Sequence, residues 1–114
     1  MALAASANHS FRFTLEGKGV PEELKEPITT LLREYETAEH EQLGQTRNAT
    51  LSDELGLTDY LADRFTVAGT PEECRQKVRA IQEAGIDVLL ITAIGPQPED
   101  IIRRFGEEVI AQLS

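Results

Sequence analysis

The sequence lacks the residues on which several classes of protein depend. Its single cysteine excludes an intramolecular disulfide, tryptophan is absent, and aromatic residues make up 5% of the chain. No run of apolar residues reaches the ~18 needed to span a membrane. The 11 basic residues are outnumbered by 20 acidic ones, and the net charge of −9 argues against nucleic acid or an anionic membrane as partner. We therefore expect a soluble cytoplasmic protein that binds neither.

The composition that remains is that of a small globular protein. The 114 residues suffice for one small domain, and 40% of them are apolar while 27% are charged. The opening residues, MALAASANHS, have no positive region typical of a secretory signal. They are rich in helix formers but have no cap before them, which predicts the tail of a helix in a chain that begins partway through a longer reading frame.

Residues 1–64 are predicted to be mostly helical. Phe11 to Leu15 alternates apolar and polar residues, which is typical of an edge strand or of a short ordered loop. From Pro21 the apolar residues recur at helical spacing, and Pro27 predicts either a kink near Glu26 or a separate first turn before a main helix from Pro27 to about Gln42. Shorter helical turns follow the polar loop at 44–50.

The pattern of residues 65–114 predicts two consecutive strand-then-helix units. The run from Phe65 to Ala68 is prone to form a strand, and Thr70, Pro71 and Glu73 together predict a capped helix start. The helix presents one apolar stripe and ends before Gly85; the stripe consists of Cys74, Val78 and Ile81.

The second unit begins with the most apolar stretch of the chain. Ile86 to Ile94 has no alternation of apolar and polar residues, which predicts a strand buried on both faces, as in parallel sheets. A second helix is expected from Pro98 to about Leu113, with one apolar face formed by Ile102, Phe105, Val109 and Leu113. The fold class predicted is therefore α/β. Because two parallel strands leave both outer edges open, we expect self-association into a homo-oligomer through those edges.

Two loops are candidate ligand sites. Gly69 and Thr70 precede a helix at the end of a predicted parallel strand, where backbone N–H groups bind phosphate or carboxylate. Gly95 follows the second strand in the corresponding position. The same residues are also found in α/β units that bind no ligand.

The other reactive side chains indicate no site of their own. His9 and His40 lie far apart without neighbouring ligands, so no metal site is predicted. His40, between Glu39 and Glu41, has the surroundings of a base or of a solvated helix end. Cys74 is interpreted as a packing residue, and the paired glutamates as helix-surface charges.

The run DRFTVAGTPEECRQKVRAIQEAGIDVLLITAIGPQPEDIIRRFGEEVI resembles the carboxyl-terminal end of luciferase-like monooxygenases. This superfamily contains flavin-dependent (FMN) and deazaflavin-dependent oxidoreductases built on a TIM-type (β/α)8 barrel. The resemblance covers Asp63 to about Leu113. It implies that the two strands are the seventh and eighth of the barrel, a carboxyl-terminal (β/α)2 portion preceded by a helical insertion in residues 1–64. Residues 1–114 would then form a single partial domain, because the whole barrel needs about 250 residues.

The resemblance implies an oxidoreductase fragment rather than a complete enzyme. In the family the cofactor ring carries hydride transfer or oxygen activation, and the protein binds it, orients it and excludes water. No catalytic residue of the family is carried over, and Gly69, Thr70 and Gly95 inherit only a place near the cofactor. We therefore expect the chain to be inactive alone, to retain neither flavin nor deazaflavin, and to require the remainder of a barrel chain. The alternative is a small, acidic, non-catalytic α/β protein that acts by interaction or self-assembly.

Overall fold

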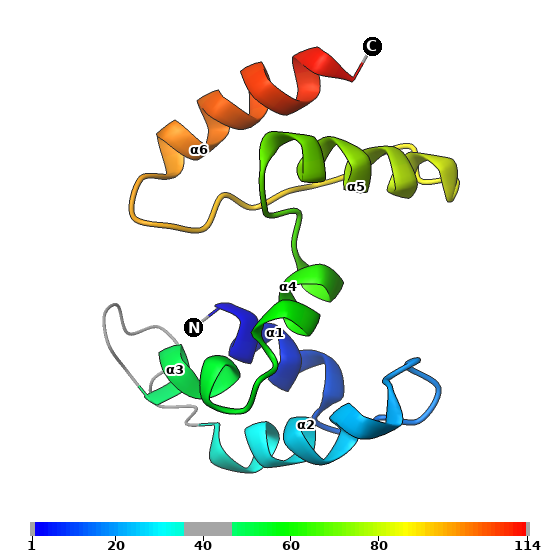
Figure 1. Ribbon diagram of the computed structural model, residues 1–114, viewed down its shortest axis with the longest axis vertical. Coiled ribbons are helices and arrows are strands. Elements are labelled where there is room, and N and C mark those ends of the chain that lie inside the picture. Colours follow the sequence, from blue (N-terminus) through cyan, green and yellow to red (C-terminus); the bar gives the residue numbers. More distant parts are fainter. Residues whose placement is uncertain (1, 36–46, 114) are drawn as a thin grey trace. The chain divides into compact units, whose positions relative to one another are not determined.

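A computed structural model describes residues 2–35 and 47–113 of the chain (Figure 1). These residues divide into two compact units, Met1–Thr66 and Val67–Ser114. The first contains helices α1 (Ala2–Phe11), α2 (Glu22–Glu34), α3 (Arg47–Glu54) and α4 (Thr58–Phe65). The second contains α5 (Pro71–Glu83), α6 (Pro98–Arg104), a π-helical turn η2 (Phe105–Val109) and a 3-10 turn η3 (Ile110–Gln112).

The first unit is a helical cluster with an apolar core. Helix α1 contributes small side chains at helical spacing and then Phe11, whose ring meets that of Phe65 at a centroid distance of 5.8 Å in a T-shaped arrangement. The guanidinium of Arg64, in α4, lies 5.2 Å from the centroid of the Phe11 ring. Further core side chains come from α2, α4 and the loops beside them: Val20, Ile28, Leu31, Tyr35, Leu57 and Leu61.

The structure resolves two alternatives that the sequence leaves open in this unit. Phe11 ends a helix and the exposed Phe13 lies in a loop, so the edge strand is wrong and the loop is confirmed. Helix α2 begins at Glu22 and contains Pro27, so a separate first turn before a main helix from Pro27 is wrong, and the kink near Glu26 stays a prediction. Pro27 is the sixth residue of α2, where it removes only one helical hydrogen bond near the start. The predicted continuation of this helix to Gln42, beyond Tyr35, lies outside the described residues.

The α/β prediction is wrong. Among residues 2–35 and 47–113 there is no strand, and neither Phe65–Ala68 nor Ile86–Ile94 pairs with another segment. Phe65 instead ends α4. A strand is stable only when a neighbouring strand satisfies its N–H and C=O groups, and the described part of the chain offers no such neighbour. The chain as described therefore does not form a (β/α)2 portion of a TIM-type barrel.

Residues 86–97 nevertheless cross the second unit in an irregular, largely extended path, drawn as a yellow to orange coil in Figure 1. The expectation that Ile86 to Ile94 is buried on both faces is also wrong, since the large side chains of this segment are exposed. A strand is buried on both faces only when it belongs to a sheet that other elements cover on each side. The described residues form no such sheet, so these side chains stay exposed.

The residues predicted to form a helix from Pro98 are helical as far as Gln112, but the type of helix changes along them. After α6 the chain widens into the π-helical turn η2 and then tightens into η3. Val109 is buried, whereas Ile102, predicted on the same apolar face, is exposed. A π turn shifts the register of the residues that follow it, so one face of the sequence pattern does not remain one face of the helix.

Candidate functional site

The loop before α5 has the capping geometry that the sequence predicts. The Thr70 hydroxyl accepts a hydrogen bond from the Glu73 N–H at 3.2 Å, and the Thr70 N–H donates to the Glu73 carboxylate at 2.7 Å. Pro71 is the first helical residue, and Gly85 follows the helix with a φ of 94°. The capped start and the glycine end of α5 are both confirmed.

The Glu73 side chain takes the place where an anion would contact this loop. Its carboxylate engages the Thr70 N–H, and a β-carbon added at Gly69, whose φ is +131°, would lie 2.5 Å from Glu73 Oε2. The backbone hydrogen bond from Thr70 lowers the pKa of Glu73 below its ordinary value. An anionic ligand group would therefore have to displace a carboxylate that the loop already stabilises.

Gly95 lies in a separate loop of the same unit. A β-carbon at Gly95 would approach Ile101 Cδ1 to 2.9 Å, so the loop packs closely on the first turns of α6. In the described residues, no hydrogen bond connects Gly95 with Gly69 or Thr70. The binding role of these three residues stays a prediction.

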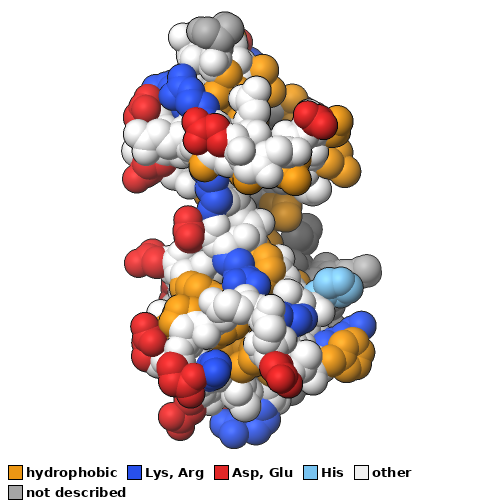
Figure 2. Space-filling view, turned by 90° about the vertical axis from the view of Figure 1, so that its right-hand side faces the viewer, with side chains coloured by type: hydrophobic (Ala, Val, Ile, Leu, Met, Phe, Trp, Pro, Cys, Tyr) orange, Lys and Arg blue, Asp and Glu red, His pale blue; other side chains and the backbone are white. Residues whose placement is uncertain are grey.

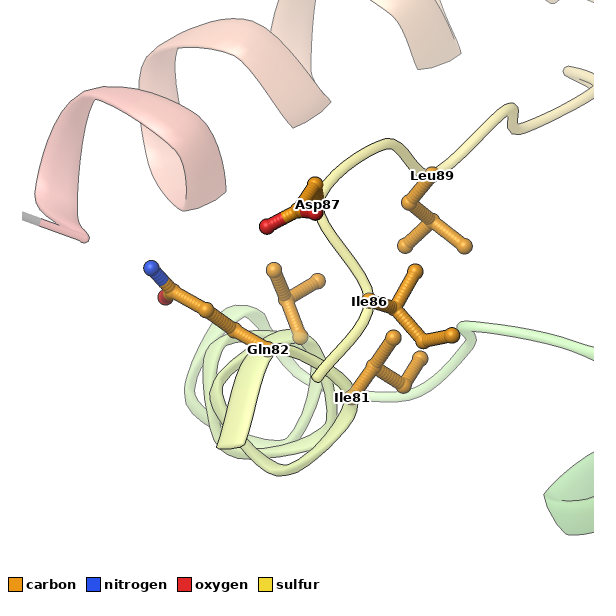
Figure 3. Close-up of a pocket in the computed structure, with 6 residues that line it drawn as sticks. Ile81, Gln82, Ile86, Asp87 and Leu89 are labelled. Atoms are coloured by element: carbon orange, nitrogen blue, oxygen red, sulfur yellow. The ribbon is translucent and has the colours of Figure 1, made fainter. Parts of the chain in front are cut away.

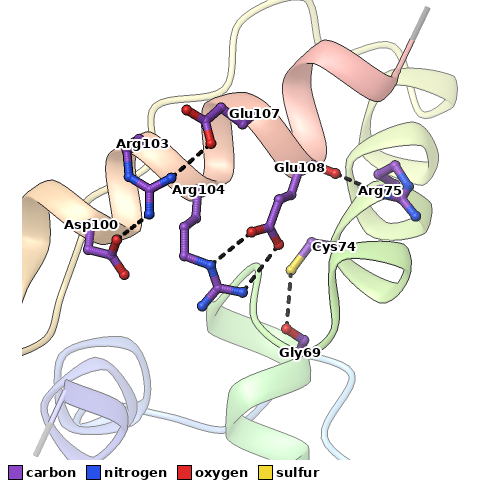
Figure 4. A network of polar contacts seen from close by, with 8 residues as sticks. All are labelled: Gly69, Cys74, Arg75, Asp100, Arg103, Arg104, Glu107 and Glu108. Carbon is purple, nitrogen blue, oxygen red and sulfur yellow. Dashed lines mark hydrogen bonds and ion pairs between the residues drawn. The ribbon is translucent and has the colours of Figure 1, made fainter.

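Cys74 has the surroundings of a packing residue. It is buried on α5, and its thiol lies 3.9 Å from the Gly69 carbonyl oxygen, to which it donates (Figure 4). Burial raises the pKa of the Cys74 thiol, and the neighbouring charge of Glu73 acts in the same direction. Because the thiolate is the reactive form, these surroundings disfavour a nucleophilic role.

Neither the histidines nor the acidic residues form a metal site in the part of the chain that the structure describes. His9 is exposed in the last turn of α1, and His40 lies outside the described residues. Glu22 and Glu23 occupy the first turn of α2, as expected of surface charges that favour a helix N-terminus.

An arginine network, not predicted from the sequence, joins α5 to the π turn. Arg75 contacts the Glu72 carboxylate at 2.6 Å and donates a second hydrogen bond, also of 2.6 Å, to the backbone carbonyl of Glu108 (Figure 4). Helix α6 continues the pattern, since Arg104 pairs with the Glu108 carboxylate at 2.9 Å and thereby lowers its pKa. The spacing of Glu72 and Arg75 could be read from the sequence, but a contact across 33 residues could not.

A shallow hollow of about 200 Å³ lies between α5 and the segment that follows it (Figure 3). Polar and apolar atoms contribute about equally to its walls; the lining residues are Val78, Ile81, Gln82, Ile86, Asp87 and Leu89. Pockets for drug-sized ligands and cofactors occupy roughly 300–1,000 Å³. This hollow is therefore too small to enclose an isoalloxazine-type ring.

No helix of the described residues is long and apolar enough to cross a membrane.

Comparison with known proteins finds similarity over about half of the chain. A 5,10-methylenetetrahydromethanopterin reductase of Methanolobus tindarius is 31% identical over 55 residues, which are 47% of this chain and 17% of the reductase. The reductase of the same name from Archaeoglobus fulgidus is 31% identical over 58 residues, 50% of this chain and 18% of the reductase. No family model and no solved structure matches. The chain thus corresponds to less than a fifth of the length of these curated relatives.

Proposed function

We propose that this chain is a fragment of a luciferase-like, flavin- or deazaflavin-dependent oxidoreductase, equivalent to its carboxyl-terminal segment, and that it is inactive alone. The observation that supports the proposal most directly is the 31% identity to two reductases over about half of the chain. A reductase is an oxidoreductase, so these relatives agree with the luciferase-like resemblance at that coarse level. The substrate in the names of these reductases, 5,10-methylenetetrahydromethanopterin, would be the first to test.

The geometry of the second unit supports the part of the proposal that concerns inactivity. The Thr70 N–H is engaged by Glu73, and the hollow beside α5 is small. These residues do not fit a flavin or deazaflavin by themselves, because a few backbone donors cannot bury its ring. The residues that hold the cofactor would therefore have to come from the rest of such an enzyme.

A segment exchange tests this proposal. The aligned segment of the Archaeoglobus fulgidus reductase is replaced by the matching 58 residues of this chain, and the purified chimera is assayed for reductase activity and bound cofactor. We expect the chimera to retain measurable activity, because an equivalent segment restores the missing part. The control is the same reductase with the aligned segment deleted, which should be inactive.

The contrary outcome is equally clear. If the chimera folds, as judged by circular dichroism, but is no more active than the deleted control, the two segments are not equivalent and the proposal fails. The isolated chain supplies the companion measurement, since after desalting it should show no flavin or deazaflavin absorbance. A yellow protein with one cofactor per chain would contradict the expectation that the isolated chain retains no cofactor.

A second candidate function is that of a small acidic interaction protein without catalysis. The specific observation in its favour is the number of large apolar side chains that the second unit exposes, including Val88, Leu90 and Ile102. Figure 2 shows hydrophobic side chains at the surface of this unit. Surfaces of this kind mark interaction sites in soluble proteins. An inactive chimera together with a defined oligomer of the isolated chain would favour this candidate.

A further inference from the structure

The segment Ile86–Ile94 combines exposed apolar side chains with a backbone that, from Asp87 on, makes no backbone hydrogen bond to another described residue. The Ile86 N–H donates to the Ile81 carbonyl at 3.4 Å, and the next backbone hydrogen bond runs from Ile101 to Gln97. Between these two bonds, no backbone hydrogen bond involves residues 87–96 within the described part of the chain. A row of unpaired N–H and C=O groups of this length is a template for pairing with another strand.

The exposure of the side chains alternates along this segment. Val88 and Leu90 are 84% and 92% exposed, whereas Leu89 and Ile91 between and after them are 41% and 39% exposed. Leu89 lines the hollow beside α5, together with Ile81 (Figure 3). Alternation with a period of two is the signature of a strand with one covered and one open face. The segment is therefore shaped for a strand although no partner strand is present in the described residues.

The segment is complementary to itself in one register. In an antiparallel pair centred on Leu90, each Val88 faces a Thr92 and each Ile86 faces an Ile94 of the other copy. Asp87, the single charged residue from Ile86 to Ile94, then faces an alanine. A parallel pair in register would instead place the two Asp87 carboxylates opposite each other, which destabilises pairing. The charge pattern thus favours a second copy in antiparallel orientation.

We infer that residues 86–94 are a dimerisation strand, which pairs with the same residues of a second copy of this chain in an antiparallel ribbon centred on Leu90. Such a contact is related by a twofold axis and closes on itself, which is the commonest symmetry of small homo-oligomers. The inference goes beyond the proposed function and does not depend on it, because it rests on the exposure and the charge pattern of this segment.

The test is sedimentation velocity of the full chain over a hundredfold range of concentration, with Leu90→Lys as the disrupting variant. Leu90 is 92% exposed, so its replacement leaves the folded monomer without a lost core contact. We expect a monomer–dimer equilibrium in the wild type and at least about a tenfold weaker one in the variant, because two like charges would meet at the centre of the ribbon. The matched control is Ile102→Lys, an exposed apolar position outside the segment, which should leave the equilibrium unchanged.

A second variant tests the register. Ala93→Lys would bring a positive charge opposite Asp87 of the other copy at both ends of an antiparallel ribbon, and should tighten the dimer by about twofold to thirtyfold. A parallel ribbon would bring the two introduced charges together and weaken the dimer.

Four results would overturn the inference. These are a monomer at every concentration, growth beyond a dimer, an equal response to Leu90→Lys and Ile102→Lys, and a dimer weakened by Ala93→Lys. Hydrogen exchange tests whether a segment of the same chain pairs with the strand instead: protection of the 86–94 amides at concentrations where the chain is monomeric would also contradict the inference. Circular dichroism of each variant verifies that the helices are intact.

Discussion

Replacing Thr70 by alanine tests the best-defined local feature of the second unit. The Thr70 side chain accepts the Glu73 N–H at 3.2 Å, while the Thr70 N–H and the Glu73 carboxylate make the reciprocal bond at 2.7 Å. The substitution removes the first bond and leaves the second possible. One of the four N–H groups at the start of α5 then has no acceptor other than water.

The expected loss follows from this geometry. Removing a threonine N-cap costs about 1 kcal/mol, within a range of roughly 0.5–2 kcal/mol. The lower half of that range applies, because Thr70 is exposed and water can replace the lost acceptor. For the second unit, Val67–Ser114, unfolding cooperatively, a loss of 1 kcal/mol lowers the melting temperature by roughly 10 °C and raises the population of the opened helix about fivefold.

Two measurements follow the loss, thermal unfolding by circular dichroism and hydrogen exchange of the α5 amides. The exchange measurement isolates α5, because the chain contains two compact units that can unfold separately. Thr70→Ser is the matched control, since it keeps the hydroxyl and should exchange as slowly as the wild type. If Thr70→Ala and Thr70→Ser behave alike in both measurements, the hydroxyl does not stabilise the helix and the argument from capping is refuted.

Three further predictions concern other contacts. Ile28→Ala removes a fully buried side chain from the first unit and should lower the free energy of unfolding by about 2–5 kcal/mol in urea denaturation, whereas the exposed Thr29→Ala should change it by less than about 1 kcal/mol. Arg75→Ala should lower the free energy of unfolding by about 1 kcal/mol and speed hydrogen exchange at residues 105–109. The Arg79 side chain donates a longer bond, of 3.5 Å, to the Gln112 carbonyl, so Arg79→Ala should have a smaller effect. Equal effects of the two substitutions would contradict the network. The pKa of Glu73 is lowered in the folded chain, so the stabilisation by its carboxylate is present above the ordinary pKa of 4.5 and is lost as the pH falls through the lower folded-state pKa. The stability of Glu73→Ala relative to the wild type should therefore rise in acid. A constant difference between the two from pH 7 to pH 3 would refute this.

Local features of the candidate site could be read from the sequence because they depend on near neighbours. The N-cap at Thr70, the proline after it and the glycine after α5 each act within four residues, and the structure confirms them. The position of the Glu73 carboxylate on the Thr70 N–H was predictable in the same way, as a capping box. That an anionic ligand would have to displace this carboxylate could not be predicted from the sequence, because it depends on which group contacts the Thr70 N–H in the folded chain.

The sequence by itself determined where helix α5 begins and ends and that residues 86–94 are apolar and extended, because dihedral preference and hydrophobicity are properties of the residues themselves. Only the tertiary structure decided that this segment has no partner strand in the described chain, that Leu90 is exposed, and that Arg75 reaches the carbonyl of Glu108. Strand pairing and long-range hydrogen bonds depend on which segments meet in space, and an apolar sequence pattern is the same whether its neighbour belongs to the same chain, to another chain or is missing. The pattern of Ile86–Ile94 therefore predicted a buried strand, and the fold left it exposed.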